Sequence, residues 1–493
     1  MALFLKKYFF NFLLLFLAFA LFQKVIWIKD FFGMRTNYIE ILYNFTVNYN
    51  GVKDIPFYFK TLFFKNILLY PFIAALFWMF LLEKAKTNTI IVNFFKNIKN
   101  LKLINLITKI GFKLLLNFKI YFLISLFFYL HKLDFYDFFL VNKNLENTEK
   151  LYYNPNNIQF NNPTQKKNLI LFFTESLEYQ IRSLDSQNPI KKIDDIKGNY
   201  INSFKHAPAT GFSIAGVVSS QCSIPFYPAI SMNLTLFKKN ELMCLSDVLA
   251  KYNYEQIFYI TVSGDFHLFG NFNKEHGFKV YDKNKIVKDG LSKDRLTGWA
   301  DGVQDDDFLE HASKKIIKLH QSKKPFNVTI ITTDTHYPYQ ISPRCKEPIK
   351  INKNNKEEYI NKIIRSYRCS SKYINDFFNA LEVAGVLEDT VIVITGDHLM
   401  ADKQEFTIPQ NLDRNIYFKM NNKRPFLRDQ INHFDIAPTI LDSLGFLPIN
   451  NSRFGFGVSA LRDDFDYKNH YKKVMDKKIV SDYLMHKLFN TSQ

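Results

Sequence analysis

The chain has 493 residues, of which 47% are hydrophobic and 17% aromatic, and its formal net charge is +18 at pH 7. This length exceeds one ordinary domain, and the apolar residues concentrate toward the N-terminus, which predicts a membrane portion followed by a soluble one. Eight lysines and no acidic residue lie between Lys84 and Lys119, among apolar stretches. A cytoplasmic loop explains this cluster better than a nucleic-acid groove, so we expect no nucleic-acid partner.

Three apolar stretches predict transmembrane helices at 8–28, 66–82 and 114–130, within a membrane domain at 1–132. Lys6 and Lys7 precede the first stretch and place its N-terminus in the cytoplasm, and no small-residue cleavage site follows it. Three spans leave everything after His131 outside the cytoplasm, whereas a fourth span near Ile39 would reverse this. We therefore expect three spans.

Four cysteines lie beyond the apolar region, and none of their spacings forms a C-x-x-C metal pattern. Two local disulfides, Cys222–Cys244 and Cys345–Cys369, would fit an extracytoplasmic domain. Four buried thiols fit the cysteine count equally well, and four cysteines allow three pairings. The pairing stays open at this point.

Residues 133–165 are polar and rich in Asn, with two Asn-Pro turn signals, and predict a linker. Beyond the linker, strand patterns at 168–174, 256–262, 327–332 and 391–394 alternate with helical patterns, including 373–383 and 436–444. This alternation predicts an α/β domain at 166–460 with a mostly parallel sheet and helices on both faces. A C-terminal extension at 461–493 would follow it.

Polar side chains follow four of these strands: Glu175, Asp265, His336 and the pair Asp397-His398. Open α/β sheets place ligands at the carboxyl ends of their strands. An adjacent carboxylate and imidazole suit a divalent metal, although an Asp-His pair after one strand is also a common loop feature. Four such strand ends together predict a metal-dependent site at this edge.

The segment 205–226 reads K-H-A-P-A-T-G-F-S-I-A-G-V-V-S-S-Q-C-S-I-P-F and turns apolar with helical spacing after Ser213. This suits a loop that presents a hydroxyl at a helix N-terminus, where free amides and the helix dipole favour a phosphate. Ser213 is a candidate nucleophile, activated by a metal because no histidine adjoins it in sequence. Taken alone, the segment also fits Ser213 as a helix N-cap.

Taken together, these segments resemble the alkaline phosphatase superfamily. They are most similar to its sulfatase-like membrane branch of lipoteichoic acid synthases and phosphoglycerol transferases, including those acting on osmoregulated periplasmic glucans. The resemblance covers about residues 165–460 and rests on N-L-I-L-F-F-T-E-S-L-E from Asn168, on 210–226, on G-D-F-H-L-F-G-N-F-N-K-E-H-G-F from Gly264, on 333–338, on T-G-D-H from Thr395, and on H-F-D-I-A-P-T-I-L-D-S-L-G from His433.

The resemblance implies one divalent metal, Mn²⁺ or Zn²⁺, with Glu175, Ser213, Asp397 and His398 as its ligands. Ser213 and His336 would be the catalytic residues, with His336 contacting the phosphate or protonating the leaving alkoxide. Substrate-binding residues would be Asp265, Asn271 and His336. Trp299, the run Asp305–Asp307 and the capping-region histidine His433 are expected to be structural.

Three departures from the relatives bear on these roles. Most relatives carry threonine where this chain has Ser213, and Thr210 is an alternative nucleophile. Formylglycine sulfatases need C-x-P-x-R or S-x-P-x-R, whereas Ser223-Ile224-Pro225 is followed by no Arg, which argues against sulfatase chemistry. Gly270 and Phe272 stand where lipoteichoic acid synthases have Trp and Arg, which argues against glycerol phosphate polymerisation.

The resemblance therefore implies a multi-pass enzyme of the bacterial inner membrane with a periplasmic catalytic domain. It would transfer a phospholipid head group to a glycan acceptor through a phosphorylated serine. Phosphoglycerol from phosphatidylglycerol is the preferred donor group, and phosphoethanolamine from phosphatidylethanolamine, with lipid A or another glycan as acceptor, is the alternative. A phosphodiesterase or sulfatase-like hydrolase and a catalytically inactive binding protein are the remaining hypotheses.

Overall fold

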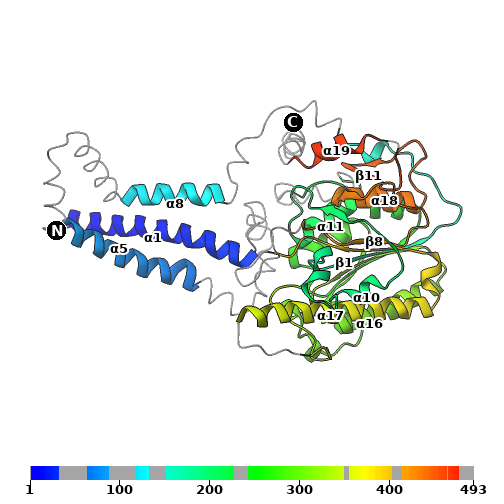
Figure 1. The fold of residues 1–493 in the computed structure, drawn as a ribbon, viewed down its shortest axis with the longest axis horizontal. Coiled ribbons are helices and arrows are strands. Elements are labelled where there is room, and N and C mark those ends of the chain that lie inside the picture. The colour runs from blue at the N-terminus through cyan, green and yellow to red at the C-terminus, as the bar shows by residue number, and fades with distance from the viewer. Residues whose placement is uncertain are drawn as a thin grey trace. The chain divides into compact units, whose positions relative to one another are not determined.

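The computed structural model describes residues 2–32, 64–87, 118–132, 151–226, 242–348, 355–401, 413–463 and 465–476 (Figure 1). They fall into two compact units: the described residues up to 132 form the first, and those from 151 onward form the second. The apolar patch near Ile39, most of the lysine cluster and residues 477–493 lie outside the described residues.

The first unit contains α1 (Ala2–Phe32), a π-helical turn (Phe64–Leu69) that leads into α5 (Tyr70–Thr87), and α8 (Phe118–Lys132). Helix α1 packs against both α5 and α8, and Leu15 and Ala75 are buried between helices. Most of the other large apolar side chains described on these helices remain exposed, as lipid-facing residues would be. By length and apolar content, one described helical stretch, Phe64–Leu81, is able to cross a membrane, and Phe9–Lys24 is a shorter apolar helix.

The second unit is built on a seven-stranded sheet in the order β2-β8-β7-β1-β6-β4-β5. Strands β7, β1, β6, β4 and β5 run parallel, β8 runs antiparallel to β7, and β2 runs antiparallel to β8. The mostly parallel sheet is as predicted. The strands are β1 (Asn168–Thr174), β2 (Asn199–Tyr200), β4 (Glu255–Ile260), β5 (Lys279–Tyr281), β6 (Phe326–Thr332), β7 (Thr390–Gly396) and β8 (Phe418–Met420).

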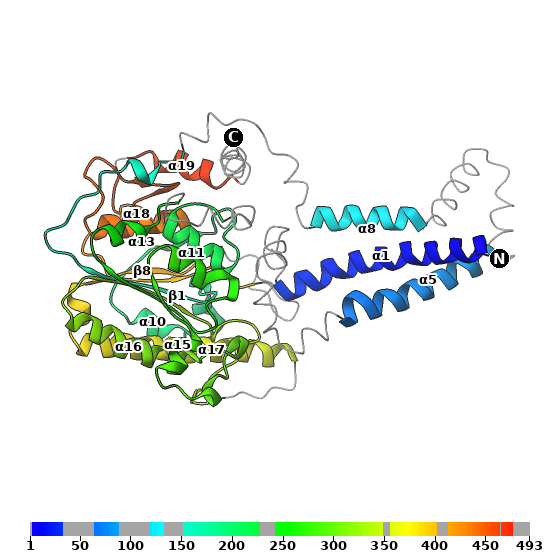
Figure 2. The same ribbon diagram turned by 180° about the vertical axis from the view of Figure 1, so that it is seen from behind.

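Helices cover both faces of this sheet, which lies between the two helical layers in Figures 1 and 2. Alternate side chains of β1 enter different cores, because successive residues of a strand point to opposite faces: Leu169 and Leu171 join one apolar cluster, Ile170 and Phe172 the other. One layer contains α11 (Ser213–Cys222), α13 (Leu245–Lys251) and α18 (Ile436–Ser443). The other contains α10 (Lys191–Asp194), α15 (Lys283–Lys288), α16 (Asp305–Gln321) and α17 (Asn355–Val383).

Smaller elements complete the unit. Strands β3 (Ser203–Lys205) and β9 (Gln430–Asn432) pair in parallel, and β10 (Arg453–Phe454) and β11 (Gly457–Val458) pair antiparallel. The remaining helices are α14 (Phe269–Glu275) and α19 (Tyr467–Val474), with 3₁₀ turns at Pro155–Asn157, Tyr179–Leu184, Phe266–Leu268, Lys293–Arg295, Trp299–Asp301, Val386–Asp389 and His433–Asp435. Helix α17 begins eighteen residues before the predicted 373–383, because the polar first half of this helix gives a weak apolar pattern.

Candidate active site

The carboxyl ends of β1 and β7 bring three of the predicted metal ligands together. These strands are neighbours in register, with Thr174 beside Gly396, so the residues that follow them meet at the sheet edge. Glu175, Asp397 and His398 are buried, and one ligand atom from each lies within 4.8 Å of the others. The predicted grouping of these three residues is therefore present in the fold.

Ser213 joins this group from the first turn of α11. Its Oγ donates a hydrogen bond to Glu175 Oε2 at 3.0 Å and lies 3.3 Å from His398 Nε2. Thr210, the alternative nucleophile, is buried and donates its hydroxyl to the carbonyl of Ala207 at 2.7 Å. Of the two candidates, the structure therefore places Ser213 beside the cluster, at a helix N-terminus where backbone amides are available to an anion.

The donor atoms of this cluster fit a divalent metal. His398 Nδ1 lies 2.8 Å from the carbonyl oxygen of Leu399. A carbonyl oxygen can only accept a hydrogen bond, so Nδ1 carries a proton. The other ring nitrogen, Nε2, faces Glu175 Oε1 at 3.3 Å and Asp397 Oδ2 at 3.5 Å. Asp397 Oδ1 accepts from two backbone amides, whereas Asp397 Oδ2 is buried and has no hydrogen-bond partner among the residues that the structure describes. Carboxylate oxygens and one imidazole nitrogen that converge in this way are suitable ligands for Zn²⁺ or Mn²⁺.

The electrostatics of the metal-free cluster agree with this fit. Burial disfavours the charge on His398, but Asp397 and Glu175 raise the pKa of its imidazole to about 10. Burial and the charge of Glu175 raise the pKa of Asp397 to about 7. Burial also opposes ionisation of Glu175, yet His398 holds the pKa of that carboxyl well below its usual value. Positive charge is thus favoured among these oxygens, and a divalent cation would replace the imidazolium proton.

Helix α11 lies directly against the loop that carries Asp397. A Cβ added to Gly216 would lie 2.0 Å from the carbonyl oxygen of Asp397, which is closer than any real contact. Glycine at this position lets the helix bring Ser213 to the predicted metal ligands.

We expect Gly216→Ala to lower the free energy of unfolding by about 1–3 kcal/mol, because the added methyl group must displace helix or loop. Metal affinity should fall as well, since the displaced loop carries Asp397 and His398. Gly211→Ala is the matched control, because a Cβ there meets nothing within 4 Å. Denaturant unfolding and metal titration of both variants measure these effects. Equal behaviour of the two variants would contradict the close packing of α11.

Two histidines that the sequence did not single out as functional hold the same loop. His433 Nε2 donates to the carbonyl of Asp397 at 2.9 Å, and burial lowers the pKa of this ring to about 3, so it stays neutral. His206 Nε2 accepts the backbone amide of Leu399 at 2.7 Å. His433 therefore does more than the capping role expected for it, although it does begin a 3₁₀ turn.

Replacing His433 by Phe should weaken metal binding about 10–100-fold, the usual cost of losing a residue that orients a ligand. It should also cost about 1–3 kcal/mol of stability, because the Asp397 carbonyl is left buried without a partner. His470 offers a matched control, since it is buried and its Nε2 bonds to the carbonyl of Phe456 at 2.8 Å. His470→Phe should lose similar stability and keep its metal affinity in calorimetric titrations. If both variants retain metal equally, the positioning role fails.

The loop after β6 places His336 near the cluster. Thr335 Oγ1 donates to the carbonyl of Glu175 at 2.6 Å, and the positive charge of His336 contributes to the low pKa of Glu175. Asp305 secures this loop: its Oδ1 accepts the amide of Thr333 at 3.0 Å. Asp305, the first residue of the acidic run at the start of α16, thus has a structural role, as expected.

Asp265 and Asn271 are exposed, and within the described part of the chain neither side chain hydrogen-bonds to Ser213, His336 or the metal-ligand set. Their role in binding substrate stays a prediction. The segment between them instead carries His267, which the sequence did not single out. The ring of Trp299 lies against that of His336, with 4.0 Å between centroids and an angle of 42° between the ring planes.

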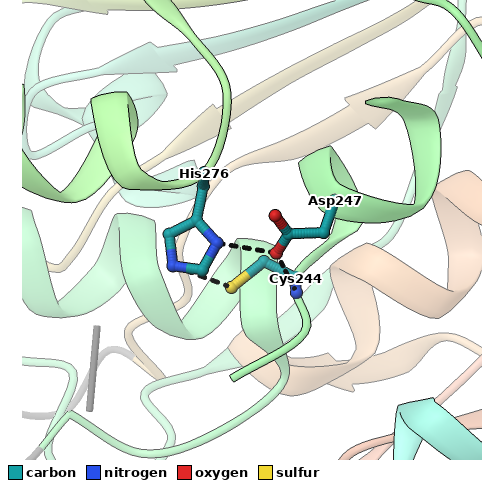
Figure 3. Close-up of side chains that lie close together, drawn as sticks. All are labelled: Cys244, Asp247 and His276. Atoms are coloured by element: carbon teal, nitrogen blue, oxygen red, sulfur yellow. Dashed lines mark hydrogen bonds and ion pairs between the residues drawn. The ribbon is translucent and has the colours of Figure 1, made fainter. Parts of the chain in front are cut away.

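A second buried group, Cys244, Asp247 and His276, also has ligand atoms within 4.8 Å of one another (Figure 3). His276 Nδ1 lies 2.6 Å from Asp247 Oδ2, and His276 Nε2 lies 3.8 Å from Cys244 Sγ. Cys244 is bonded to Cys222, and Cys345 to Cys369, so this sulfur is not a thiolate and cannot serve as a metal ligand. The disulfide fastens the end of α11 to the start of α13. The contact between Asp247 and His276 joins α13 to the residue that follows α14.

Comparison with known proteins gives the family. The family model described as Sulfatase matches residues 167–446, more than half of the chain. The chain belongs to the sulfatase family. The matched range contains the whole candidate site.

Curated relatives named phosphoglycerol transferase I, from Salmonella paratyphi B and Salmonella newport, are each 28% identical over 313 residues. The match covers 61% of this chain and 39% of each relative, so the chain spans well under half of their length. Among solved structures, the lipoteichoic acid synthase LtaP from Listeria monocytogenes is similar with a TM-score of 0.51 and 18% identity, covering 64% of this chain and 81% of that one. At that identity the likeness shows the fold alone.

Proposed function

We propose that this protein is a phosphotransferase that moves a phospholipid head group to a glycan through a phosphorylated Ser213. The observation that carries the proposal is the placement of the Ser213 hydroxyl. It lies at the start of α11 and hydrogen-bonds to Glu175 within a buried set of metal-binding side chains. The names of the Salmonella relatives support phosphoglycerol as the transferred group, from phosphatidylglycerol.

The proposed metal is a single Mn²⁺ or Zn²⁺ ion, held by Glu175, Asp397, His398 and the Ser213 oxygen. When bound, such an ion lowers the pKa of the serine hydroxyl and neutralises charge on the phosphoryl oxygens. The hydrogen bond to Glu175 Oε2 holds the serine oxygen beside these ligands. The hydroxyl proton would pass to solvent, because the low pKa of Glu175 makes that carboxylate a weak base. The amides of the first turn of α11 and the helix dipole favour the phosphate.

The first step forms a bond between Ser213 Oγ and phosphorus and breaks the bond from phosphorus to the diacylglycerol oxygen. His336 is the proposed proton donor to that leaving oxygen, because a histidine beside the site is the usual proton carrier near neutral pH. In the second step a glycan hydroxyl attacks phosphorus and passes its proton to His336, which the first step left neutral. The bond from phosphorus to Ser213 Oγ breaks, and the head group is joined to the glycan.

Sulfatase chemistry is disfavoured despite the family name. Ser223, the serine of the S-x-P sequence, lies at the opposite end of α11 from Ser213 and is buried. Its hydroxyl donates to the carbonyl of Phe434 at 2.6 Å. A residue enclosed in this way cannot present an oxygen to substrate at the metal ligands.

We also propose that α1, α5 and α8 anchor the chain in the inner membrane, with the catalytic unit in the periplasm. The apolar, largely exposed side chains of these helices support the anchoring. Both disulfides are stable in an oxidising compartment, which supports the periplasmic placement.

The test uses the full chain in detergent with Mn²⁺ or Zn²⁺ and phosphatidylglycerol or phosphatidylethanolamine labelled in the head group. Diacylglycerol release and label on an added periplasmic glucan are measured. Labelled glucan from phosphatidylglycerol supports the proposal, and label only from phosphatidylethanolamine changes the donor. Free labelled head group without labelled glucan would make the protein a phosphodiesterase. No release from either lipid would indicate an inactive homologue.

A further inference from the structure

A row of five rings connects the two proposed catalytic residues. The ring of Phe212, the residue before Ser213, lies 6.0 Å from that of His267, which stacks on Phe266 at 4.0 Å. Phe266 meets Trp299 at 5.0 Å, and Trp299 meets His336 at 4.0 Å. We call these five residues the aromatic row. One end of it adjoins the candidate nucleophile, and the other end is the candidate proton donor.

The row is held on two strained turns. His267 and Leu268 are consecutive left-handed residues, with φ of 48° and 59°, and Ala300 and Asp301 are another such pair, with φ of 51° and 52°. Left-handed backbone is costly for residues other than glycine, and pairs of them tend to mark functional sites.

Backbone hydrogen bonds between glycines close both turns. Gly270 donates to the carbonyl of Gly264 at 2.7 Å, and Gly298 donates to the carbonyl of Gly302 at 2.9 Å. A Cβ at Gly270 would lie 2.8 Å from the Gly264 oxygen, so this closure requires a residue without one. The chain therefore fixes both turns tightly, which pre-organises the rings that they carry.

Four of the five rings of the row are partly exposed. Phe266, His267, Trp299 and His336 are half-buried, in contrast to the buried Phe212. The ring of His267 lies 6.0 Å from that of Phe212, the residue before Ser213, so it is close to the candidate nucleophile. Partly exposed aromatic faces suit the carbon atoms of a small alcohol, and imidazole nitrogens suit its hydroxyl or phosphoryl oxygens.

We propose that the aromatic row binds the alcohol part of the phosphorylated head group, and that His267 is the substrate-contacting residue on the nucleophile side. This inference rests on the proposed function, because it assumes a phosphate ester at Ser213. It assigns discrimination between head groups to residues 266–267 and 299, whereas the metal ligands and α11 bind the phosphate that all head groups share.

The test compares two probes, sn-glycerol 3-phosphate and inorganic phosphate, by calorimetric titration of the full chain in detergent with Mn²⁺ present. The wild type should bind glycerol 3-phosphate about tenfold more tightly, a typical gain from contacts to a few extra atoms. His267→Asn removes the ring, and Asn tolerates the left-handed backbone. Trp299→Leu removes a second ring of the row. In each variant the ratio of the affinity for glycerol 3-phosphate to that for inorganic phosphate should fall close to one. The affinity for inorganic phosphate should change less than about threefold.

His311→Asn is the matched control. His311 is a half-buried histidine of α16 with its own aromatic neighbours, Tyr259 and Tyr281, at 6.0 and 6.2 Å, and its loss should leave the ratio unchanged. The inference is overturned if both row variants keep the preference for glycerol 3-phosphate over phosphate. It is also overturned if the wild type shows no such preference. The imidazole NMR signals of the wild type give a readout that needs no variant to fold: glycerol 3-phosphate should shift the His267 resonance more than phosphate does, and equal shifts overturn the inference.

These outcomes separate the inference from the proposed function. Probe binding needs no transfer, so a discriminating row in a protein that never cleaves phospholipid would refute the transferase and leave the row as a binding site. If the protein transfers the head group and both variants keep the wild-type affinity ratio, the binding role of the aromatic row is refuted and the proposed function stands.

Discussion

Ser213→Ala is expected to reduce head-group release by about 10⁴-fold or more, as the loss of a covalent nucleophile does in other enzymes. The physical reason is the position of the hydroxyl, 3.0 Å from Glu175 Oε2 and 3.3 Å from His398 Nε2, where no other described hydroxyl is seen to contact both residues. The measurement is the initial rate of diacylglycerol release by the full chain in detergent, with saturating metal.

Two further variants make this result specific. Thr210→Ala should keep activity within about threefold, because the one hydrogen bond of the Thr210 hydroxyl among the described residues goes to the Ala207 carbonyl. Ser213→Thr should retain most of the activity, since it restores a hydroxyl at the same backbone position. Loss of activity in Thr210→Ala with retention in Ser213→Ala would assign the nucleophile to Thr210 and refute the geometry described above.

Asp397→Asn is expected to weaken metal binding by more than about 100-fold, because Asp397 is a proposed direct ligand, and losing a ligand should cost more than the 10–100-fold typical of a residue that orients one. Asparagine keeps an oxygen for the two backbone amides that Asp397 Oδ1 accepts, so the loop should keep its shape. Metal at 100 times its Kd should stabilise the wild type by about 2.7 kcal/mol, and the variant should show no such gain. Unfolding with and without Mn²⁺ or Zn²⁺ measures both effects.

Without metal, Asp397→Asn should be no less stable than the wild type. The buried carboxylates of Asp397 and Glu175 repel each other when no cation is bound, and the substitution removes one of these charges. Asp247→Asn is the control: Asp247 is a buried carboxylate of the cluster that contains the disulfide, and it accepts the amide of Cys244 at 2.8 Å. It should lose stability without any change in metal affinity. Metal binding abolished by Asp247→Asn and kept by Asp397→Asn would move the metal to the other cluster.

Local sequence patterns were sufficient to predict the central strands and the residues at their ends. Strand β1 spans Asn168–Thr174 as predicted, and α11 begins at Ser213. Strands of a parallel sheet can be recognised in the sequence because both of their faces are buried, which gives continuous apolar runs. Since neighbouring parallel strands end at one edge, the meeting of Glu175 with Asp397-His398 follows from strand order alone.

Features that depend on tertiary contact were not predictable. Strands β2, β5 and β8 are only two or three residues long, too short for a periodic pattern to be visible. The bond from His433 to the Asp397 carbonyl joins residues 36 positions apart, and no local signal marks it. His267 lies between two predicted substrate residues, yet its approach to the site depends on a left-handed turn that favours no particular motif.

The most direct test of a metal-dependent phosphoserine is the intact mass of the full chain after brief incubation with phosphatidylglycerol, followed by peptide mapping. We expect an added phosphoglycerol group on the peptide that contains Ser213, formed with Mn²⁺ or Zn²⁺ and absent after chelation. An adduct on another residue, or diacylglycerol release with no adduct at any quench time, would contradict it.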